Sequence, residues 1–281
     1  MLSRDIVITR RVDALKTIEK ANLNLLKKLS LVTFVSASQI HFTATVQAQS
    51  QSQVQSQLQV HGQVAVKAKT EHYLSKGKPI RVDWIRPAVD SGKPVVLILY
   101  GSSGSDPNDY FHGCAEQLAA AGFVVGIIHY FDSVNIKWAD SSKMSKYFSY
   151  WLGTVGDAVT YSQKQFGSGR KIYLFGYSLG AQLSLTTAAR DERIGAVSSM
   201  SGCFVLPPPK SGRMPPVLLL HGDRDYTVPL QREKRTEAQL KLLKAAIETH
   251  IYPKQGHCFD AALAQDAIVR TIGFFDKTAR K

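Results

Sequence analysis

The sequence predicts an α/β fold, with a mostly parallel central sheet and helices on both faces. Short apolar runs typical of strands alternate with longer amphipathic segments typical of helices over residues 70–281. The runs at 94–100 and 123–130 are almost continuously apolar, as in parallel strands buried on both faces. With 281 residues, 44% of them hydrophobic, the chain is long enough to bury one large core.

The elements follow one another in a regular order. Apolar and polar residues alternate at 80–86, which predicts a strand, and each later strand is followed by a helix or a loop. Because crossovers between parallel strands are right-handed, we expect the strand-to-helix loops on one edge of the sheet, where function should lie. The expected strands are 80–86, 94–100, 123–130, 171–177, 194–202, 216–222 and 250–253, and the expected helices are 109–120, 147–166, 179–190, 231–248 and about 260–277.

The N-terminal part differs from the rest. Lys27 and Lys28 precede a moderately apolar run that leads to Ala48, the order of a secretory signal. This pattern predicts export, periplasmic or secreted, after cleavage near Ala48; the alternatives are an uncleaved extension of residues 1–48 and a cytoplasmic protein. Gln and Ser dominate residues 49–69, which predicts a flexible linker. The domain that carries the function is then expected at 70–281.

Charge and composition argue against several classes of protein. The net charge of +13 comes from basic residues mixed with acidic ones, as in 231–244, with no basic stripe interleaved with aromatics, so a nucleic-acid partner is not expected. No run of about 18 apolar residues is present, so no stable membrane span is expected. His112, Cys114, His257 and Cys258 match no metal-ligand spacing, and no metal is expected. The oligomeric state stays open.

The strongest motif is Gly176-Tyr177-Ser178-Leu179-Gly180, between an expected strand and an expected helix. Glycines at both ends permit a sharp turn that holds Ser178 above the sheet, where it can act as a nucleophile. The Leu179 amide, at the start of the helix, would then face a developing oxyanion. The alternative is an ordinary strand-to-helix turn with an idle serine.

Serine needs a base and an orienting acid, and both follow later strands. Asp225 lies in the loop after the strand 216–222, and His257 lies between the last strand and the last helix. Their order, Ser178, Asp225, His257, is that of nucleophile, acid and base. Asp223 is the rival acid, and we expect His221 to be a structural hydrogen-bonding residue.

These segments resemble the dienelactone hydrolase branch of the α/β-hydrolases. YPKQGHCFD at 252–260, HGDRDYTVP at 221–229 and AIVRTIGFF at 267–275 are similar to segments of that branch, and the resemblance covers about 78–278. It implies the α/β-hydrolase fold, with Ser178 as nucleophile, Asp225 as acid and His257 as base. The enzyme that names the branch uses cysteine where this chain has serine, so the esterase relatives fit better.

In those relatives the loop after an early strand supplies the second oxyanion amide. By position this is Ser102, with Gly101 and Ser103 as alternatives, and a plain glycine-rich turn is the other interpretation of 100–104. A phosphate-binding loop is not indicated, because no G-K-[ST] follows. The residues expected to shape the substrate pocket are Tyr100, Gly101, Tyr177 and Trp138.

Together these features predict a serine hydrolase that cleaves small or medium carboxylic esters through an acyl-enzyme, without a cofactor. The partner would be a small-molecule ester. Two other classes stay open: a peptidase or acyltransferase with the same three residues, and a non-catalytic binding relative of the same fold.

Overall fold

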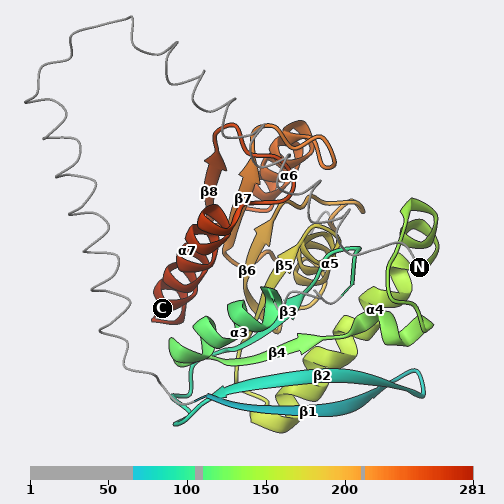
Figure 1. Ribbon diagram of the computed structural model, residues 1–281, viewed down its shortest axis with the longest axis vertical. Coiled ribbons are helices and arrows are strands. Elements are labelled where there is room, and N and C mark those ends of the chain that lie inside the picture. The colour runs from blue at the N-terminus through green and yellow to red at the C-terminus, as the bar shows by residue number, and fades with distance from the viewer. Residues whose placement is uncertain (1–65, 105–109, 210–212, 281) are drawn as a thin grey trace, which may run out of the picture. The chain divides into compact units, whose positions relative to one another are not determined.

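A mixed eight-stranded sheet forms the centre of the computed structural model, which describes residues 66–104, 110–209 and 213–280 (Figure 1). The strand order is β1-β2-β4-β3-β5-β6-β7-β8. β2 pairs antiparallel with β1 and β4, and every other pair is parallel. The strands are β1 Val66–Ser75, β2 Lys78–Pro87, β3 Val95–Leu99, β4 Val124–Ile128, β5 Ile172–Tyr177, β6 Ile194–Met200, β7 Val217–Gly222 and β8 Ile247–Tyr252. The predicted export signal and most of the predicted linker lie outside the described residues.

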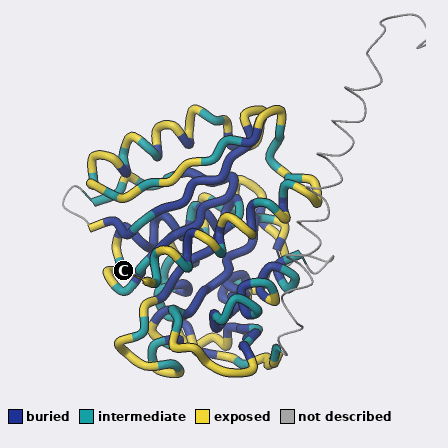
Figure 2. Tube along the Cα trace, turned by 90° about the vertical axis from the view of Figure 1, so that its left-hand side faces the viewer, coloured by how far each residue is buried: buried dark blue, intermediate teal, exposed yellow. Residues whose placement is uncertain are grey.

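Helices cover the sheet on both faces. α3 packs against α7, and α4 packs against α5. β3 and β4 are buried along their whole length, which requires cover on both sides, and Figure 2 shows the buried strands enclosed by partly exposed helices. The helices are α3 Tyr110–Ala120, the 3-10 turn η1 Tyr130–Val134, α4 Ser141–Phe166, α5 Leu179–Ala188, α6 Leu230–Leu242 and α7 Ala261–Ala279. The predicted fold class is therefore confirmed.

β1 was not predicted, and it includes residues 66–69, which the sequence assigned to the linker. It pairs with β2 over its whole length, from Val66 opposite Pro87 to Ser75 opposite Lys78. Lys76 and Gly77 both have positive φ, 48° and 77°, as a two-residue hairpin turn requires. The strand is mostly exposed, so its stability comes from backbone pairing rather than from the apolar pattern on which strand prediction depends.

The segment after α6 also differs from the prediction. The sequence predicts one helix over 231–248, but the helix ends at Leu242 and Lys244 has a left-handed φ of 55°. Ile247–Tyr252 then forms β8, which pairs in parallel with β7. The polar, helix-favouring composition of this segment is overridden by tertiary pairing at the edge of the sheet.

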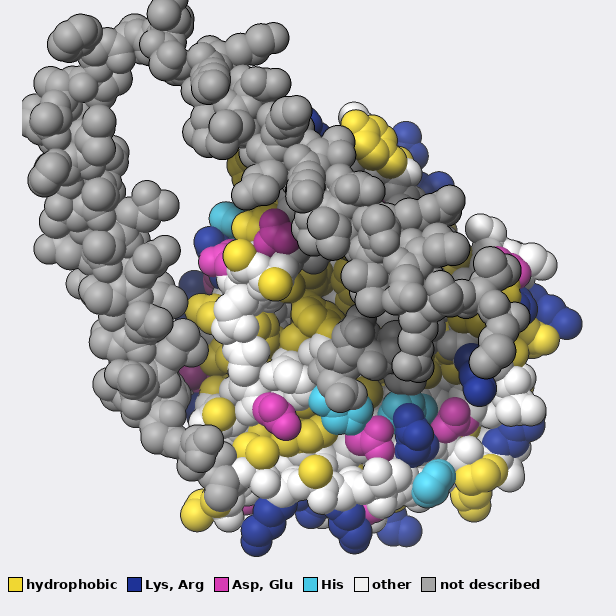
Figure 3. Space-filling view, in the orientation of Figure 1, with side chains coloured by type: hydrophobic (Ala, Val, Ile, Leu, Met, Phe, Trp, Pro, Cys, Tyr) yellow, Lys and Arg dark blue, Asp and Glu magenta, His cyan; other side chains and the backbone are white. Residues whose placement is uncertain are grey.

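No helix in the described ranges has both the length and the hydropathy needed to cross a membrane. On the face shown in Figure 3, Lys and Arg side chains of the described residues are interspersed with Asp and Glu. This arrangement agrees with the mixed charge pattern of the sequence.

Asp83, in β2, lies in a polar cluster beside η1. Its carboxylate accepts hydrogen bonds from Thr70 Oγ1 at 2.7 Å and His129 Nε2 at 2.6 Å. The Arg81 guanidinium, which can only donate, lies 2.9 Å from His129 Nδ1, so Nε2 carries the proton. Burial disfavours the charged carboxylate, but the hydrogen bonds from His129 and Thr70 outweigh it and lower the pKa of Asp83 to about 2.

Asp83→Asn should therefore destabilise the fold at neutral pH. A carboxyl whose pKa is lower in the folded chain stabilises it above the unfolded pKa of 3.8 and loses this effect as pH falls through about 2. The shift corresponds to about 2 kcal/mol at pH 7. Urea unfolding at pH 7, 5, 4 and 3 should show a gap between wild type and variant that narrows below pH 4. A gap of equal size at every pH would contradict this account.

Candidate active site

Ser178 sits at the sharp turn between β5 and α5. Its φ is 53° with ψ of −115°, a conformation that costs free energy for a residue with a side chain. A Cβ at Gly180 would lie 1.9 Å from the Leu99 carbonyl oxygen, and one at Gly176 would lie 2.4 Å from the Gly180 carbonyl oxygen. The two glycines of the motif are therefore required by the close approach of α5 to β3 and to the end of β5.

The structure brings Ser178, His257 and Asp225 into one hydrogen-bonded chain. His257 Nε2 lies 2.9 Å from Ser178 Oγ, and His257 Nδ1 lies 2.7 Å from Asp225 Oδ2. Asp225 Oδ1 accepts the backbone N–H groups of Thr227 and Val228, each at 2.8 Å. Since Oδ1 is occupied by two donors, only Oδ2 faces the imidazole, and the Asp225 side chain has no exposed surface.

Two loops from different parts of the chain hold this arrangement. Arg224 N–H donates to the Gln255 carbonyl at 2.9 Å, and Asp223 N–H donates to the Tyr252 carbonyl at 3.1 Å. A Cβ at Gly222 would lie 2.2 Å from the Gln255 carbonyl oxygen. The loop after β7 therefore packs directly on the loop after β8, which sets the distance between Asp225 and His257.

The backbone of His257 is also held in place. Its carbonyl accepts a hydrogen bond from Ser201 Oγ at 3.1 Å and from the Tyr177 hydroxyl at 3.3 Å. Sequence reasoning did not single out Ser201. Its position directly after β6, at the same sheet edge as Ser178, is the signal that could have indicated it.

Asp223 does not take the position of the acid. Its Oδ1 accepts the Lys254 backbone N–H at 2.6 Å, and the residue is exposed. It stabilises the turn after β8 instead. Within 66–104, 110–209 and 213–280, no group of three or more His, Cys, Asp or Glu side chains is arranged to hold a metal ion.

Two backbone amides lie near Ser178. Leu179 is the first residue of α5, so its N–H has no carbonyl partner within the helix. Gly104 N–H donates to the Gly101 carbonyl at 3.1 Å, which closes a four-residue turn, and the Ser102 N–H has no hydrogen-bond partner among the described residues. A Cβ at Gly101 would lie 3.5 Å from Ser178 Cβ, so the turn stands directly beside the serine.

The four predicted pocket residues lie in three different settings. Gly101 and Tyr177 lie at the site, and the Tyr177 ring centre is 5.5 Å from that of His257. Burial raises the pKa of the Tyr177 phenol well above its usual range. Tyr100 is 2% exposed, its ring centre lies 4.6 Å from that of Tyr130 in a stacked arrangement, and its hydroxyl oxygen accepts the Phe131 backbone N–H at 3.3 Å. The structure therefore corrects the prediction for Tyr100, which is a core residue because the rings of Phe111, Tyr130 and Phe131 pack around it.

Trp138 is at the surface, with 54% of it exposed. The Lys143 ammonium lies over its ring at 3.4 Å from the centre. The next residue, Ala139, donates its N–H to the Ser102 carbonyl at 2.8 Å. Trp138 thus belongs to a segment that borders the turn at 101–104.

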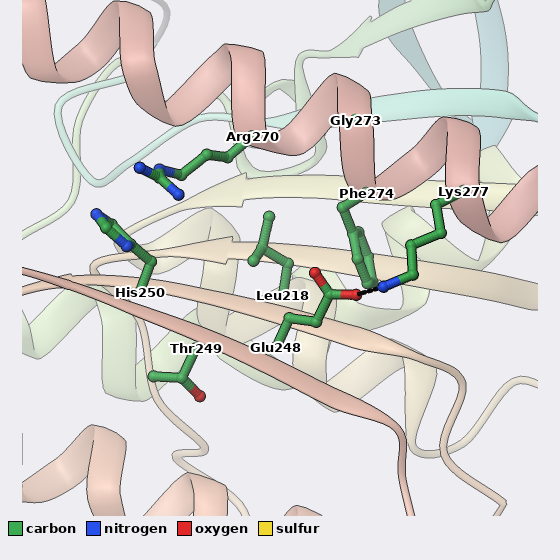
Figure 4. A pocket seen from close by; sticks show the side chains of 8 residues that line it. All are labelled: Leu218, Glu248, Thr249, His250, Arg270, Gly273, Phe274 and Lys277. Atoms are coloured by element: carbon green, nitrogen blue, oxygen red, sulfur yellow. Dashed lines mark hydrogen bonds and ion pairs between the residues drawn. The ribbon is translucent and has the colours of Figure 1, made fainter.

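A separate cavity of about 310 Å³ lies between β8 and α7 (Figure 4). It is bordered by the Glu248–Lys277 ion pair at 2.7 Å and has Leu218 and Phe274 at its apolar side. None of the predicted site residues lines it. This cavity is therefore not part of the candidate site at Ser178.

These features together are characteristic of the α/β-hydrolase fold: a mixed sheet, a serine on a sharp strand-to-helix turn, and an aspartate and a histidine on later loops. The model of the dienelactone hydrolase family matches residues 84–277, and the chain belongs to this family. The predicted resemblance is thereby confirmed.

Known relatives agree with this assignment. A Salmonella typhimurium protein provisionally named carboxymethylenebutenolidase is 23% identical over 238 residues, which cover 75% of this chain and 87% of that protein. The dienelactone hydrolase of Anabaena variabilis is similar in structure, with a TM-score of 0.59, 19% identity and coverage of 75% of this chain and 98% of that one. An esterase of Pyrococcus furiosus gives a TM-score of 0.62 at 14% identity, covering 77% and 92%. Family and neighbours together indicate a hydrolytic enzyme.

Proposed function

We propose that this protein is a serine hydrolase that cleaves carboxylic esters, with Ser178 as nucleophile, His257 as base and Asp225 as acid. The observation that carries the proposal is the continuous hydrogen-bonded chain from Asp225 Oδ2 through the His257 imidazole to Ser178 Oγ, with 2.7 Å and 2.9 Å links. Such a chain supplies what a serine lacks at neutral pH, a base within reach and a group that orients the base.

In the first half of the reaction Ser178 Oγ attacks the ester carbonyl carbon while His257 Nε2 accepts the hydroxyl proton. Asp225 accepts the Nδ1–H hydrogen bond and stabilises the imidazolium that forms. The carbonyl oxygen becomes an oxyanion, for which the amides of Leu179 and Ser102 are the proposed donors. His257 then gives its proton to the leaving alcohol oxygen, and the acyl group remains on Ser178.

In the second half a water molecule replaces the alcohol. His257 accepts a proton from the water as its oxygen attacks the acyl carbon, and a second oxyanion forms at the same amides. When this intermediate collapses, His257 returns the proton to Ser178 Oγ and the carboxylic acid is released. Every proton moves through the one imidazole, so this route needs no cofactor.

The comparisons support the ester class without identifying the ester. Relatives carry the names dienelactone hydrolase, carboxymethylenebutenolidase and esterase. Tyr177, beside His257, and Phe111, at 6.5 Å from the Tyr177 ring, give one side of the site an aromatic surface. We therefore expect uncharged esters with an apolar acyl group to be accepted.

A fluorophosphonate probe and a panel of esters test this proposal. The probe should label one residue, Ser178, and nitrophenyl esters of short and aromatic acids should be hydrolysed by the same protein. A peptide substrate turned over faster than every ester would favour a peptidase, and acyl transfer to added alcohol in preference to water would favour an acyltransferase. Absence of labelling and of turnover would point to a binding protein and refute the proposal.

A further inference from the structure

Directly behind Asp225 lies a buried pair of ionisable residues that the proposed reaction does not use. His221, the second-last residue of β7, has no exposed side-chain surface. The side chain of Glu233, in the first turn of α6, is 2% exposed. His221 Nδ1 contacts Glu233 Oε2. Both groups are removed from water, so their placement costs free energy unless they satisfy each other.

The other ring nitrogen of His221 faces the loop that carries Asp225. Nε2 lies 2.8 Å from the Val228 carbonyl oxygen and 3.4 Å from Asp225 Oδ2. A carbonyl oxygen only accepts, so Nε2 must carry a hydrogen. Asp225 Oδ2 is the same oxygen that accepts from His257 Nδ1, at 2.7 Å. The polar contacts therefore run without interruption from Glu233 through His221 and Asp225 to His257.

Both partners of the contact between Glu233 and His221 bind a proton more readily than usual. Burial raises the pKa of Glu233, and Glu233 Oε1 has no hydrogen-bond partner among the described residues. Burial disfavours the charged imidazole, but Glu233 outweighs this and raises the pKa of His221. The other charged groups near the pair are Asp225 and Glu237, which also raise the pKa of Glu233. With one proton at this contact the pair is neutral overall.

We propose that Glu233 and His221 are positioning residues for ester hydrolysis. The Val228 carbonyl fixes the hydrogen of His221 on Nε2, and Glu233, which lies against Nδ1, holds the other side of the ring. The Nε2–H group donates to the Val228 carbonyl and so holds the loop that carries Asp225. It also lies 3.4 Å from Asp225 Oδ2, which helps to keep the carboxylate oriented toward His257. This inference rests on the proposed function, because it assigns a role to the residues behind the acid.

Two variants of Glu233 separate this role from simple packing. In Glu233→Leu nothing partners Nδ1, so only the Val228 carbonyl holds the imidazole, and the ring can shift and weaken its Nε2–H contact with the loop of Asp225. In Glu233→Gln the amide N–H can donate to Nδ1, which leaves the hydrogen on Nε2. Glu237→Gln is the matched control, since Glu237 lies on the same helix, is half-buried, pairs with Lys241 at 2.6 Å and influences Glu233 only through its charge.

Ester hydrolysis is measured per active site titrated with the fluorophosphonate. We expect Glu233→Leu to lower kcat by roughly tenfold with KM within about twofold, because a small displacement of Asp225 misplaces the base. The low-pH side of its kcat–pH profile (the acid limb) should also change, because the Asp225 carboxylate loses the nearby Nε2–H of His221. Glu233→Gln and Glu237→Gln should keep kcat within about threefold and leave the acid limb in place.

The tautomer of His221 gives a test that does not depend on a variant that folds. Long-range ¹H–¹⁵N spectra of the wild-type protein should show His221 with a hydrogen on Nε2. A hydrogen on Nδ1 alone would overturn the proposal. So would a Glu233→Leu protein that melts at a lower temperature but has wild-type kcat per titrated site and an unchanged acid limb. If the wild type neither reacts with the probe nor cleaves esters, it is the proposed function that fails.

Discussion

Ser178→Ala is expected to lower kcat for ester hydrolysis by about a thousandfold or more. Ser178 Oγ lies 2.9 Å from His257 Nε2, and no other hydroxyl is bonded to that nitrogen among the described residues. Without Oγ no acyl-enzyme can form, and only transition-state binding by the neighbouring amides remains. The remaining rate is measured with a nitrophenyl ester, and covalent labelling is measured by mass spectrometry.

The fold should tolerate this change. Alanine keeps the backbone geometry of the turn, and only one partly enclosed oxygen atom is removed, so thermal unfolding should shift by no more than a few degrees. Ser142→Ala, on the exposed side of α4, is the matched control and should keep wild-type kcat. Ester turnover or labelling that survives in Ser178→Ala would refute the assignment of the nucleophile.

Asp225→Asn is expected to lower kcat by roughly 10³- to 10⁴-fold, the size of effect that follows when the base is held in the wrong tautomer. Asp225 Oδ1 accepts two backbone N–H groups, from Thr227 and Val228, so the oxygen of asparagine must take this place. Its NH₂ group then faces His257 Nδ1 and donates to it. The imidazole hydrogen moves to Nε2, which can no longer accept the proton of Ser178.

Kinetics at saturating ester, with active sites counted by the fluorophosphonate, measure this effect. Asp223→Asn is the control: its Oδ1 accepts only the Lys254 backbone N–H, which an amide oxygen also accepts, so kcat should stay near that of the wild type. An Asp225→Asn protein with kcat within tenfold of the wild type would contradict the role of Asp225 as the acid. A larger loss of kcat in Asp223→Asn than in Asp225→Asn would indicate that Asp223 is the acid instead.

The sequence predicted most of the sheet because burial on both faces leaves a direct mark on composition. The apolar runs that became β3, β4, β5 and β7 needed no tertiary information to be recognised. β1 left no such mark, and of β8 only the C-terminal part fell within an expected strand, at 250–253. Both are edge strands with exposed polar residues, and each is defined by the neighbour with which it pairs, β2 and β7.

The candidate site shows the same division. The glycines around Ser178 indicated a sharp turn, and the order of Asp225 and His257 after later strands placed them on the same edge. The distances between Ser178, His257 and Asp225 depended on contacts that no local sequence pattern encodes. These are the hydrogen bond from the Arg224 N–H to the Gln255 carbonyl and the one from the Ser201 hydroxyl to the His257 carbonyl. Tyr100, predicted for the pocket, turned out to be core because its ring stacks on Tyr130.

By itself, the sequence determined the fold class, the family and which residues could carry the chemistry, because strand burial and turn geometry restrict residue type locally. Tertiary structure alone decided which oxygen of Asp225 faces His257, that Asp223 serves a turn, and that Glu233 lies against His221. These contacts join residues up to 32 positions apart in the chain, and the contact between Ser178 and His257 joins residues 79 apart; all of them exist only once the strands have paired and the loops have packed.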